Sequence, residues 1–248
     1  MASAKPTVSV VIPAYNEATY IDRLLEALSK QSYKNFEVIV SDADSGDGTD
    51  KVVASFKDPL AAKLVSSPPK GPGAGRNAGA RAARGDWLLF LDADVDIDDP
   101  NFIQELVEQT SLCGWDTSSA RLAARGKAAK AYSNLYRYQR WLSHTRRPVA
   151  SGYCIFTSTA VFKKAGGFNE KIQFGEDYEY VSRTGRGGKF GFVDTTYYYV
   201  DPRRNENEGW KLTYKGTLNE IYRLLLGYKK LEKKPIKYEF GQHKKRAK

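Results

Sequence analysis

The sequence predicts an α/β protein whose central sheet is mostly parallel, with helices on both faces. Two observations support this fold class. Short apolar runs rich in β-branched residues recur through the first ninety residues, as expected for strands buried on both faces of a parallel sheet. Segments with apolar residues at helical spacing separate these runs. Strict alternation of strand and helix is typical of parallel, doubly wound sheets.

The first half of the chain carries the clearest pattern. Pro13 is expected to end the first strand, and Asn16 to cap the following helix, whose apolar residues start at Tyr20. Residues 76–84 are alanine-rich and predict a helix that Gly85 closes, after a loop of sequence PPKGPGAG. The predicted strands of this half are residues 8–12, 36–40, 63–66 and 87–91.

The second half is less regular and leads into a basic end. We predict a leader over residues 1–6, a domain over 7–208 with halves at 7–95 and 96–208, and an amphipathic extension over 209–248. The expected strands are 115–122, 189–193 and 195–200, and the expected helices are 101–109, 127–142, 175–188 and 217–234.

Charge is concentrated at the C-terminal end. Residues 211–248 hold twelve Lys and Arg against three Glu, a net charge of +9 out of +10 for the whole chain. This end is either a solvated tail or a segment that meets an anionic surface such as lipid headgroups. The near-neutral remainder argues against a nucleic-acid-binding protein, which would carry a basic face throughout.

The sequence also indicates the cellular compartment in which the protein is expected. The N-terminus lacks the apolar region of a signal peptide, and no apolar run approaches the ~20 residues of a membrane span. Cys113 and Cys154 form no zinc or disulfide pattern and suit a reducing compartment. We expect a cytoplasmic protein that is peripheral on the inner face of the cell membrane.

Three polar loops follow predicted strands: PAYNE at 13–17, SDADSGDGT at 41–49 and DADVD at 92–96. In open α/β sheets, ligands bind beyond the carboxyl ends of the strands, so these loops are expected to converge on one site. Asp92 and Asp94 would point the same way in extended backbone. Paired carboxylates suit Mg²⁺ or Mn²⁺, which keep coordination positions open for phosphate oxygens. The alternative is an acidic turn that caps the next helix.

Other residues of these loops suggest a nucleotide ligand. Asp42 ends its strand where a carboxylate can accept from a base N–H or a sugar hydroxyl, and Tyr15 offers a stacking face. Arg76 opens a helix and is expected to steer a diphosphate. The G-x-G-x-x-A spacing from Gly73 to Ala78 is a weak dinucleotide fingerprint, because it does not follow the first strand.

Four segments in this order resemble family 2 glycosyltransferases with the GT-A fold: VSVVIPAYNE, VIVSDADSGDGT, GPGAGRNAGARAARGDWLLFLDADVD and GGFNEKIQFGEDYEY. The resemblance covers about residues 7–200. It implies a UDP- or GDP-sugar donor, a divalent cation (Mn²⁺ or Mg²⁺) and inversion at the anomeric carbon, with 7–95 as the nucleotide-binding half and 96–208 as the acceptor half. The residues that match the family's site are Pro13, Tyr15 and Glu17 for the nucleoside, Asp42 for the base, Asp92 and Asp94 for ribose and metal–diphosphate, and Asp177 for the general base, with Glu176 beside it.

The role of general base, which the resemblance assigns to Asp177, agrees with the chemistry of sugar transfer. The acceptor hydroxyl must lose its proton to a carboxylate that faces the anomeric carbon. Glu176 and Asp177 are expected at a helix N-terminus, which would keep a carboxylate ionised. The alternative is an acidic first turn with no reactive role.

The sequence departs from the family pattern at positions that affect which reaction is expected. Processive members carry Gln-x-x-Arg-Trp after the base, and nothing like it follows Asp177, so we expect addition of a single sugar. Gln139-Arg140-Trp141 lies upstream with different spacing and is interpreted as coincidence. Arg203 and Arg204 resemble a loop that folds over the diphosphate in some relatives, or else belong to a solvated loop.

The acceptor is predicted from two amphipathic segments. Residues 127–142 and 217–234 combine aromatic or apolar residues with Lys and Arg, as surfaces that lie against lipid do. This favours a lipid-linked glycan or a polyprenyl phosphate as acceptor. A polysaccharide or small-molecule acceptor stays open, with the first segment then a cover for the sheet. A nucleotidyltransferase is disfavoured, because PAYNE is not a basic glycine-rich loop.

Overall fold

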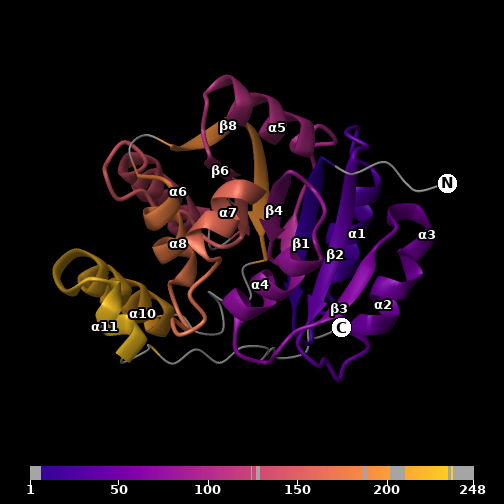
Figure 1. Cartoon of the computed structure of the whole chain (residues 1–248), viewed down its shortest axis with the longest axis horizontal. Coiled ribbons are helices and arrows are strands. Elements are labelled where there is room, and N and C mark those ends of the chain that lie inside the picture. Colours follow the sequence, from indigo (N-terminus) through magenta and orange to yellow (C-terminus); the bar gives the residue numbers. More distant parts are fainter. Residues whose placement is uncertain are drawn as a thin grey trace.

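The computed structural model describes residues 7–123, 125–126, 129–186, 189–201, 210–233 and 236. These residues build an eight-stranded sheet in the order β3-β2-β1-β4-β7-β6-β8-β5 (Figure 1). The strands are β1 Val8–Ala14, β2 Phe36–Asp42, β3 Lys63–Ser66, β4 Trp87–Leu91, β5 Val95–Asp96, β6 Thr117–Leu122, β7 Cys154–Ser158 and β8 Phe190–Val200.

The direction of the strands divides the sheet into two halves. Strands β3, β2, β1 and β4 are parallel, as the alternating pattern predicted. Strand β7 runs antiparallel to both β4 and β6, while β8 is parallel to β6 and antiparallel to β5. The sheet is therefore mixed in its second half, where the sequence pattern is also least regular.

Helices cover both faces of the sheet (Figure 1). Alternate residues of β1 enter different apolar clusters: Val10 packs with Leu24 of the first helix, and Val11 packs with Phe162 and Tyr180 on the other face. The helices are α1 Ile21–Ser29, α2 Thr49–Ser55, α3 Lys57–Leu60, α4 Pro72–Ala82, α5 Phe102–Leu112, α6 Ala129–Leu142, α7 Thr159–Ala165, α8 Glu176–Thr184, α10 Trp210–Ile221, the π-helical turn η2 Tyr222–Leu226 and α11 Tyr228–Lys233.

The end of β1 differs from the prediction. Pro13 does not stop the strand, which continues to Ala14. Pairing of β1 with β4 ends at Val11, so the missing N–H of Pro13 costs no ladder bond on that side. Asn16 does not cap α1, which begins at Ile21. Its backbone is left-handed (φ 57°), and its side chain accepts a hydrogen bond from Gly46 N in the next loop.

Helix α4 begins at Pro72, so half of the predicted PPKGPGAG loop is helical. Proline is favoured in the first turn of a helix, where its missing N–H has no partner to lose. The glycines serve close packing: a Cβ at Gly79 would lie 2.4 Å from Val11 Cγ1. Small residues therefore let α4 lie directly on β1, which brings Arg76 to the edge of the sheet.

The later elements show two further differences. The two strands predicted over 189–200 are one strand, β8, whose register with β6 shifts between Ala120 and Arg121. The predicted helix over 217–234 begins earlier, at Trp210, and is interrupted at Gly227, which has a positive φ of 71°. No helix among the described residues is long and apolar enough to cross a membrane. The predicted domain limits at 6 and 208 fall outside those residues.

Candidate active site

A buried arginine links two carboxylates from distant parts of the chain. Arg76 on α4 is 2% exposed. Its Nη2 donates to Asp92 Oδ1 at 2.7 Å, and its Nη1 donates to Glu176 Oε1 at 2.8 Å. Asp92 directly follows β4, and Glu176 opens α8. The guanidinium also lies over the ring of Phe168, with its carbon 5.3 Å from the ring centre.

Asp177 belongs to the same cluster through Gly152. Asp177 Oδ2 accepts a hydrogen bond from Gly152 N at 2.6 Å, and Oδ1 accepts one from Tyr178 N at 2.8 Å. The carbonyl of Gly152 accepts from Arg76 Nη2 at 3.3 Å. A side chain at position 152 would displace the guanidinium, because its Cβ would lie 2.2 Å from that nitrogen. Asp177 is half-buried, so its fixed carboxylate can still meet a ligand.

Burial governs the acidity of this pair. Loss of solvent raises the pKa of Glu176 to about 7, with a contribution from the charge of Asp177 and in opposition to Arg76. Burial likewise raises the pKa of Asp177, although Arg76 and the N–H groups of Gly152 and Tyr178 oppose the shift. Burial thus acts against the ionisation that the helix N-terminus was expected to favour, and desolvation sets the direction of both pKa shifts.

The predicted nucleoside residues lie at the ends of neighbouring parallel strands. Pro13 and Asp42 belong to β1 and β2, which are adjacent, and β1 also adjoins β4, which Asp92 follows. Glu17 is 8% exposed, and Tyr15 is half-buried. These positions share one edge of the sheet with Asp92, and hydrogen bonds join the loop after β1 to the loop after β2.

The loops after β1 and β2 are joined to each other. Asp42 accepts hydrogen bonds from the backbone and hydroxyl of Ser45, whose Oγ accepts from Asn16 N. Asp47 accepts from Ala18 N, and Thr49 Oγ1 accepts from the backbone of the first loop. The interpretation of Asp47 and Thr49 as turn residues is thus supported, and Asp42 is held at the mouth of the loops.

The aspartate-rich segment after β4 is divided among separate partners. Asp96 pairs with Arg23, Asp98 pairs with Arg125, and Asp99 accepts from Thr196 Oγ1 at 2.6 Å. Val95 N donates to Asp92 O at 3.1 Å, so residues 92–94 form a turn and not the extended backbone that was predicted. Asp92 and Asp94 are nevertheless both half-buried and reachable from solvent.

Two predictions lie elsewhere. Arg203 and Arg204 fall outside the described residues. On α6 the predicted aromatic surface is divided, because Tyr132 and Leu142 are 5% exposed while Trp141 is 65% exposed, and Gln139 on the buried face is 1% exposed. Sequence reasoning missed Gln139, although its position seven residues after Tyr132 marks the buried face of the helix.

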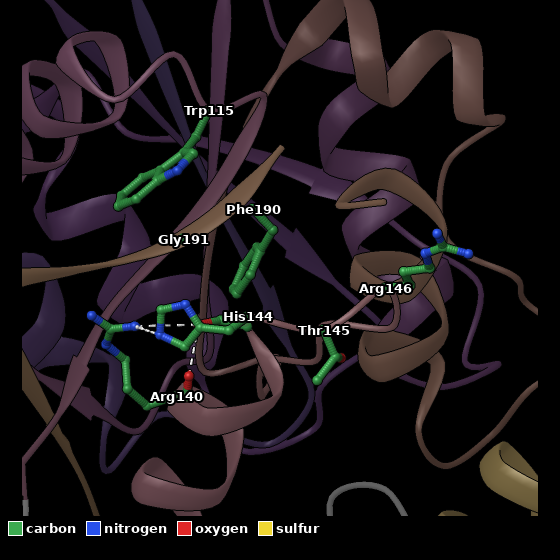
Figure 2. A pocket seen from close by; sticks show the side chains of 8 residues that line it. Trp115, Arg140, His144, Thr145, Arg146, Phe190 and Gly191 are labelled. Atoms are coloured by element: carbon green, nitrogen blue, oxygen red, sulfur yellow. Dashed lines mark hydrogen bonds between the residues drawn. The ribbon is translucent and has the colours of Figure 1, made fainter. Parts of the chain in front are cut away.

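A cavity of about 500 Å³ lies away from this cluster (Figure 2). Trp115 and Phe190 line it at the starts of β6 and β8, and those strand ends form the edge of the sheet opposite Asp92. Figure 2 shows Arg140 and His144 turned toward each other, 2.6 Å apart, and Arg140 Nε also pairs with Asp194. The cavity therefore adds nothing to the carboxylate site.

The family is shown by the sequence itself. The model of glycosyl transferase family 2 matches residues 9–158. The chain belongs to this family. The match includes Asp42, Asp92 and Asp94, whereas Glu176 and Asp177 lie beyond it.

Curated family members are similar over part of their length. Glycosyltransferase AglE of Haloferax volcanii is 31% identical over 197 residues, which are 76% of this chain and 64% of the relative. The succinoglycan biosynthesis protein ExoO of Rhizobium meliloti is 38% identical over 109 residues, 44% of this chain and 31% of the relative. The family 2 chain thus spans less than two thirds of these relatives.

Solved structures show the same fold. The mannosyltransferase PcManGT from Pyrobaculum calidifontis, in complex with GDP-Man and Mn²⁺, superposes with a TM-score of 0.70 at 19% identity, over 95% of this chain and 67% of that one. S. aureus TarS 1-349 in complex with UDP superposes with a TM-score of 0.62 at 23% identity, over 87% of this chain and 65% of that one. The GT-A fold predicted from the sequence is therefore confirmed.

Proposed function

We propose that this family 2 chain is an inverting glycosyltransferase that moves one sugar from a nucleotide-diphosphate sugar to an acceptor hydroxyl or phosphate. One observation carries the proposal: Arg76 joins Asp92, at the strand end expected to meet the donor, to the helix start that bears Asp177. Donor binding and proton acceptance would thereby share a single rigid site. PcManGT is in complex with GDP-Man and TarS with UDP, which supports a nucleotide-sugar donor here.

The reaction assigns a role to each side of the cluster. The acceptor oxygen attacks the anomeric carbon, and the bond from that carbon to the diphosphate oxygen breaks with its electron pair on the diphosphate. Asp177 accepts the proton of an acceptor hydroxyl, and its raised pKa makes it a better proton acceptor. Arg76 keeps a positive charge between Asp92 and Glu176, which limits their mutual repulsion.

A divalent cation fits the donor side of the cluster, where the protein and the donor phosphates would both supply its ligands. Among the described residues no group of three or more His, Cys, Asp or Glu forms a metal cage. Asp92 and Asp94 are half-buried carboxylates, and Mn²⁺ or Mg²⁺ held by one or two such groups takes its other ligands from phosphate and water. When bound, such an ion neutralises the charge that develops on the leaving diphosphate.

The acceptor is proposed to be lipid-linked at the surface of an anionic membrane, on its cytoplasmic side. The described part of the extension leaves large apolar side chains in solvent: Tyr214, Ile221, Leu224 and Leu225 are 43–77% exposed. Trp141 of α6 is exposed near them, since its neighbour Tyr138 contacts Glu220. Exposed apolar patches beside basic sequence favour a lipid surface.

A thermal-shift panel of UDP-, GDP- and dTDP-sugars, with and without Mn²⁺, tests the function. We expect one nucleotide to raise the melting temperature, and only in the presence of metal. Asp94→Asn should abolish the shift that metal and nucleotide produce together. Asp177→Asn should keep donor binding and lose transfer to a hydroxyl. Near-normal turnover of Asp177→Asn would indicate a phosphate acceptor, which is already ionised. No shift with any donor would overturn the proposal.

A further inference from the structure

A buried side chain closes a ring of contacts around the proposed base. Gln139 of α6 is 1% exposed. Its Nε2 donates to Ser151 Oγ at 2.7 Å and to Tyr178 Oη at 2.8 Å. Ser151 directly precedes Gly152, and Tyr178 directly follows Asp177. Both amide hydrogens of Gln139 are thus used on the two neighbours of the Gly152–Asp177 hydrogen bond.

We propose that Gln139 is a positioning residue, which fixes the carboxylate of Asp177 by tying the Ser151–Gly152 turn to the first turn of α8. This inference rests on the proposed function. The two atoms that hold the Asp177 carboxylate are Gly152 N and Tyr178 N, at 2.6 and 2.8 Å. Each belongs to a segment on which Gln139 acts, so a shift of either segment moves a hydrogen bond of the base.

A neutral amide matches the chemistry of its two hydroxyl partners at this position. One nitrogen with two hydrogens can donate to two hydroxyl oxygens at once. Burial and the charge of Asp177 raise the pKa of Tyr178 far above its ordinary value, so its hydroxyl stays neutral and accepts this bond. An apolar side chain of equal length would fill the space and leave both hydroxyls without a donor from α6.

The neighbouring residues of α6 do not share this role. Tyr138 donates to Glu220 of α10 at 2.5 Å and accepts from Arg223 of η2, so these hydrogen bonds run to other segments than the two that hold the Asp177 carboxylate. Arg140 pairs with Asp194. Of these three residues, Gln139 alone contacts the neighbours of Asp177. Tyr138→Phe is therefore a matched control on the same helix.

The test compares Gln139→Met, Tyr178→Phe and their double variant, with the donor that the thermal-shift panel selects. We expect kcat for nucleotide release to fall roughly 10- to 100-fold in Gln139→Met, because small displacements of a reacting group cost about that much. The dissociation constant of the donor should change less than twofold. The double variant should be no slower than the slower single variant, since both remove the same contact. Tyr138→Phe should match the wild type.

Several outcomes would overturn the positioning role. These are an unchanged kcat in Gln139→Met, effects that multiply in the double variant, and a loss of donor affinity as large as the loss of kcat. A crystal structure of Gln139→Met tests the role without any activity: if Gly152 N still donates to an unmoved Asp177, the inference is wrong. Failure of the proposed function would be seen separately, as a wild-type protein that binds and turns over no nucleotide sugar.

Discussion

At the residue scale, the buried charge of Arg76 is compensated by carboxylate partners. Arg76 is among the largest fully buried side chains of the described residues, and its guanidinium is surrounded by carboxylates. Burying a charge is unfavourable unless paired groups offset the lost hydration. The sequence predicted that this arginine opens a helix and steers a diphosphate; in the structure the helix begins at Pro72, and Arg76 is a buried link from α4 to Asp92 after β4 and to Glu176 of α8.

Replacement of Arg76 should therefore cost stability. Arg76→Met leaves the buried Glu176 without its cationic partner, and we expect the free energy of unfolding to fall by about 3–5 kcal/mol. Urea unfolding measures this. Adding Glu176→Gln should recover part of the loss, because the unpaired charge is gone. Arg81→Met, at an exposed position of the same helix, is the control and should change stability by less than about 0.5 kcal/mol. A loss that Glu176→Gln deepens would contradict the pairing argument.

From the residue pattern alone, the site was predictable where strand ends determine it, whereas Glu176 and Asp177 came from the family resemblance. Asp42 ends one parallel strand and Asp92 and Asp94 follow another, and such strands place their ends at one edge whatever the details of packing. The bridge from Arg76 to Glu176 spans a hundred residues, and no local pattern indicates it. Gln139 was misjudged for the same reason, since its partners Ser151 and Tyr178 come from other elements.

At the element scale, one acidic side chain joins the parallel strands. Glu37 of β2 is 4% exposed and accepts hydrogen bonds from Ser9 of β1, Lys63 of β3 and Arg84 after α4. Burial opposes its ionisation, but the hydrogen bonds from Lys63, Arg84 and Ser9 prevail and lower its pKa below 4.5. The first three strands and the start of β4 are thereby held in register by a charge, in addition to their apolar contacts.

Glu37 should make stability depend on pH in the acid range. Because its pKa is lower in the folded chain, its contribution is complete above pH 4.5 and is lost as pH falls through the folded value. Glu37→Gln should unfold more easily than wild type at pH 7, by about 1–3 kcal/mol. The difference should shrink as pH drops below 4.5. Urea unfolding between pH 3 and 8 measures it, with exposed Glu108→Gln as control. A difference that stays constant down to pH 3 would contradict the assignment.

Element boundaries departed from prediction where tertiary contacts overrode local signals. Pro13 stays within β1 because β2 still pairs with β1 at this position, whereas the pairing with β4 has already ended. Half of the glycine-rich loop is instead the start of α4, and Gly75 in that half lies so close to Pro13 that a Cβ would be 2.9 Å from it, a packing constraint that no spacing reveals. By contrast the alternation of strand and helix, which is set by hydrophobic period, predicted the parallel half of the sheet correctly.

At the scale of the whole molecule, the described C-terminal segment buries Leu231 together with polar side chains and leaves several large apolar side chains in solvent. Asn219 and Arg223 are 2% exposed, and Glu232 accepts from Asn169. Leu225 on the same segment is 77% exposed. Figure 1 places α10 and α11 beside α8, at the side of the molecule far from α1. An arrangement of this kind is unfavourable in water alone and becomes favourable when lipid covers the apolar side.

Binding to vesicles tests that surface. We expect the chain to co-sediment with phosphatidylglycerol vesicles and weakly with phosphatidylcholine vesicles, because basic residues add attraction to anionic headgroups. Leu224→Ser with Leu225→Ser should lower the partition coefficient roughly tenfold or more, given about 1.5–3 kcal/mol for each buried leucine. Leu112→Ser is the matched control, since Leu112 is 79% exposed but belongs to α5, which Figure 1 places away from α10 and α11. Raised salt should weaken binding to the anionic vesicles by screening. Equal effects of the two leucine sites would show that exposure alone, and not a membrane-facing patch, accounts for the binding.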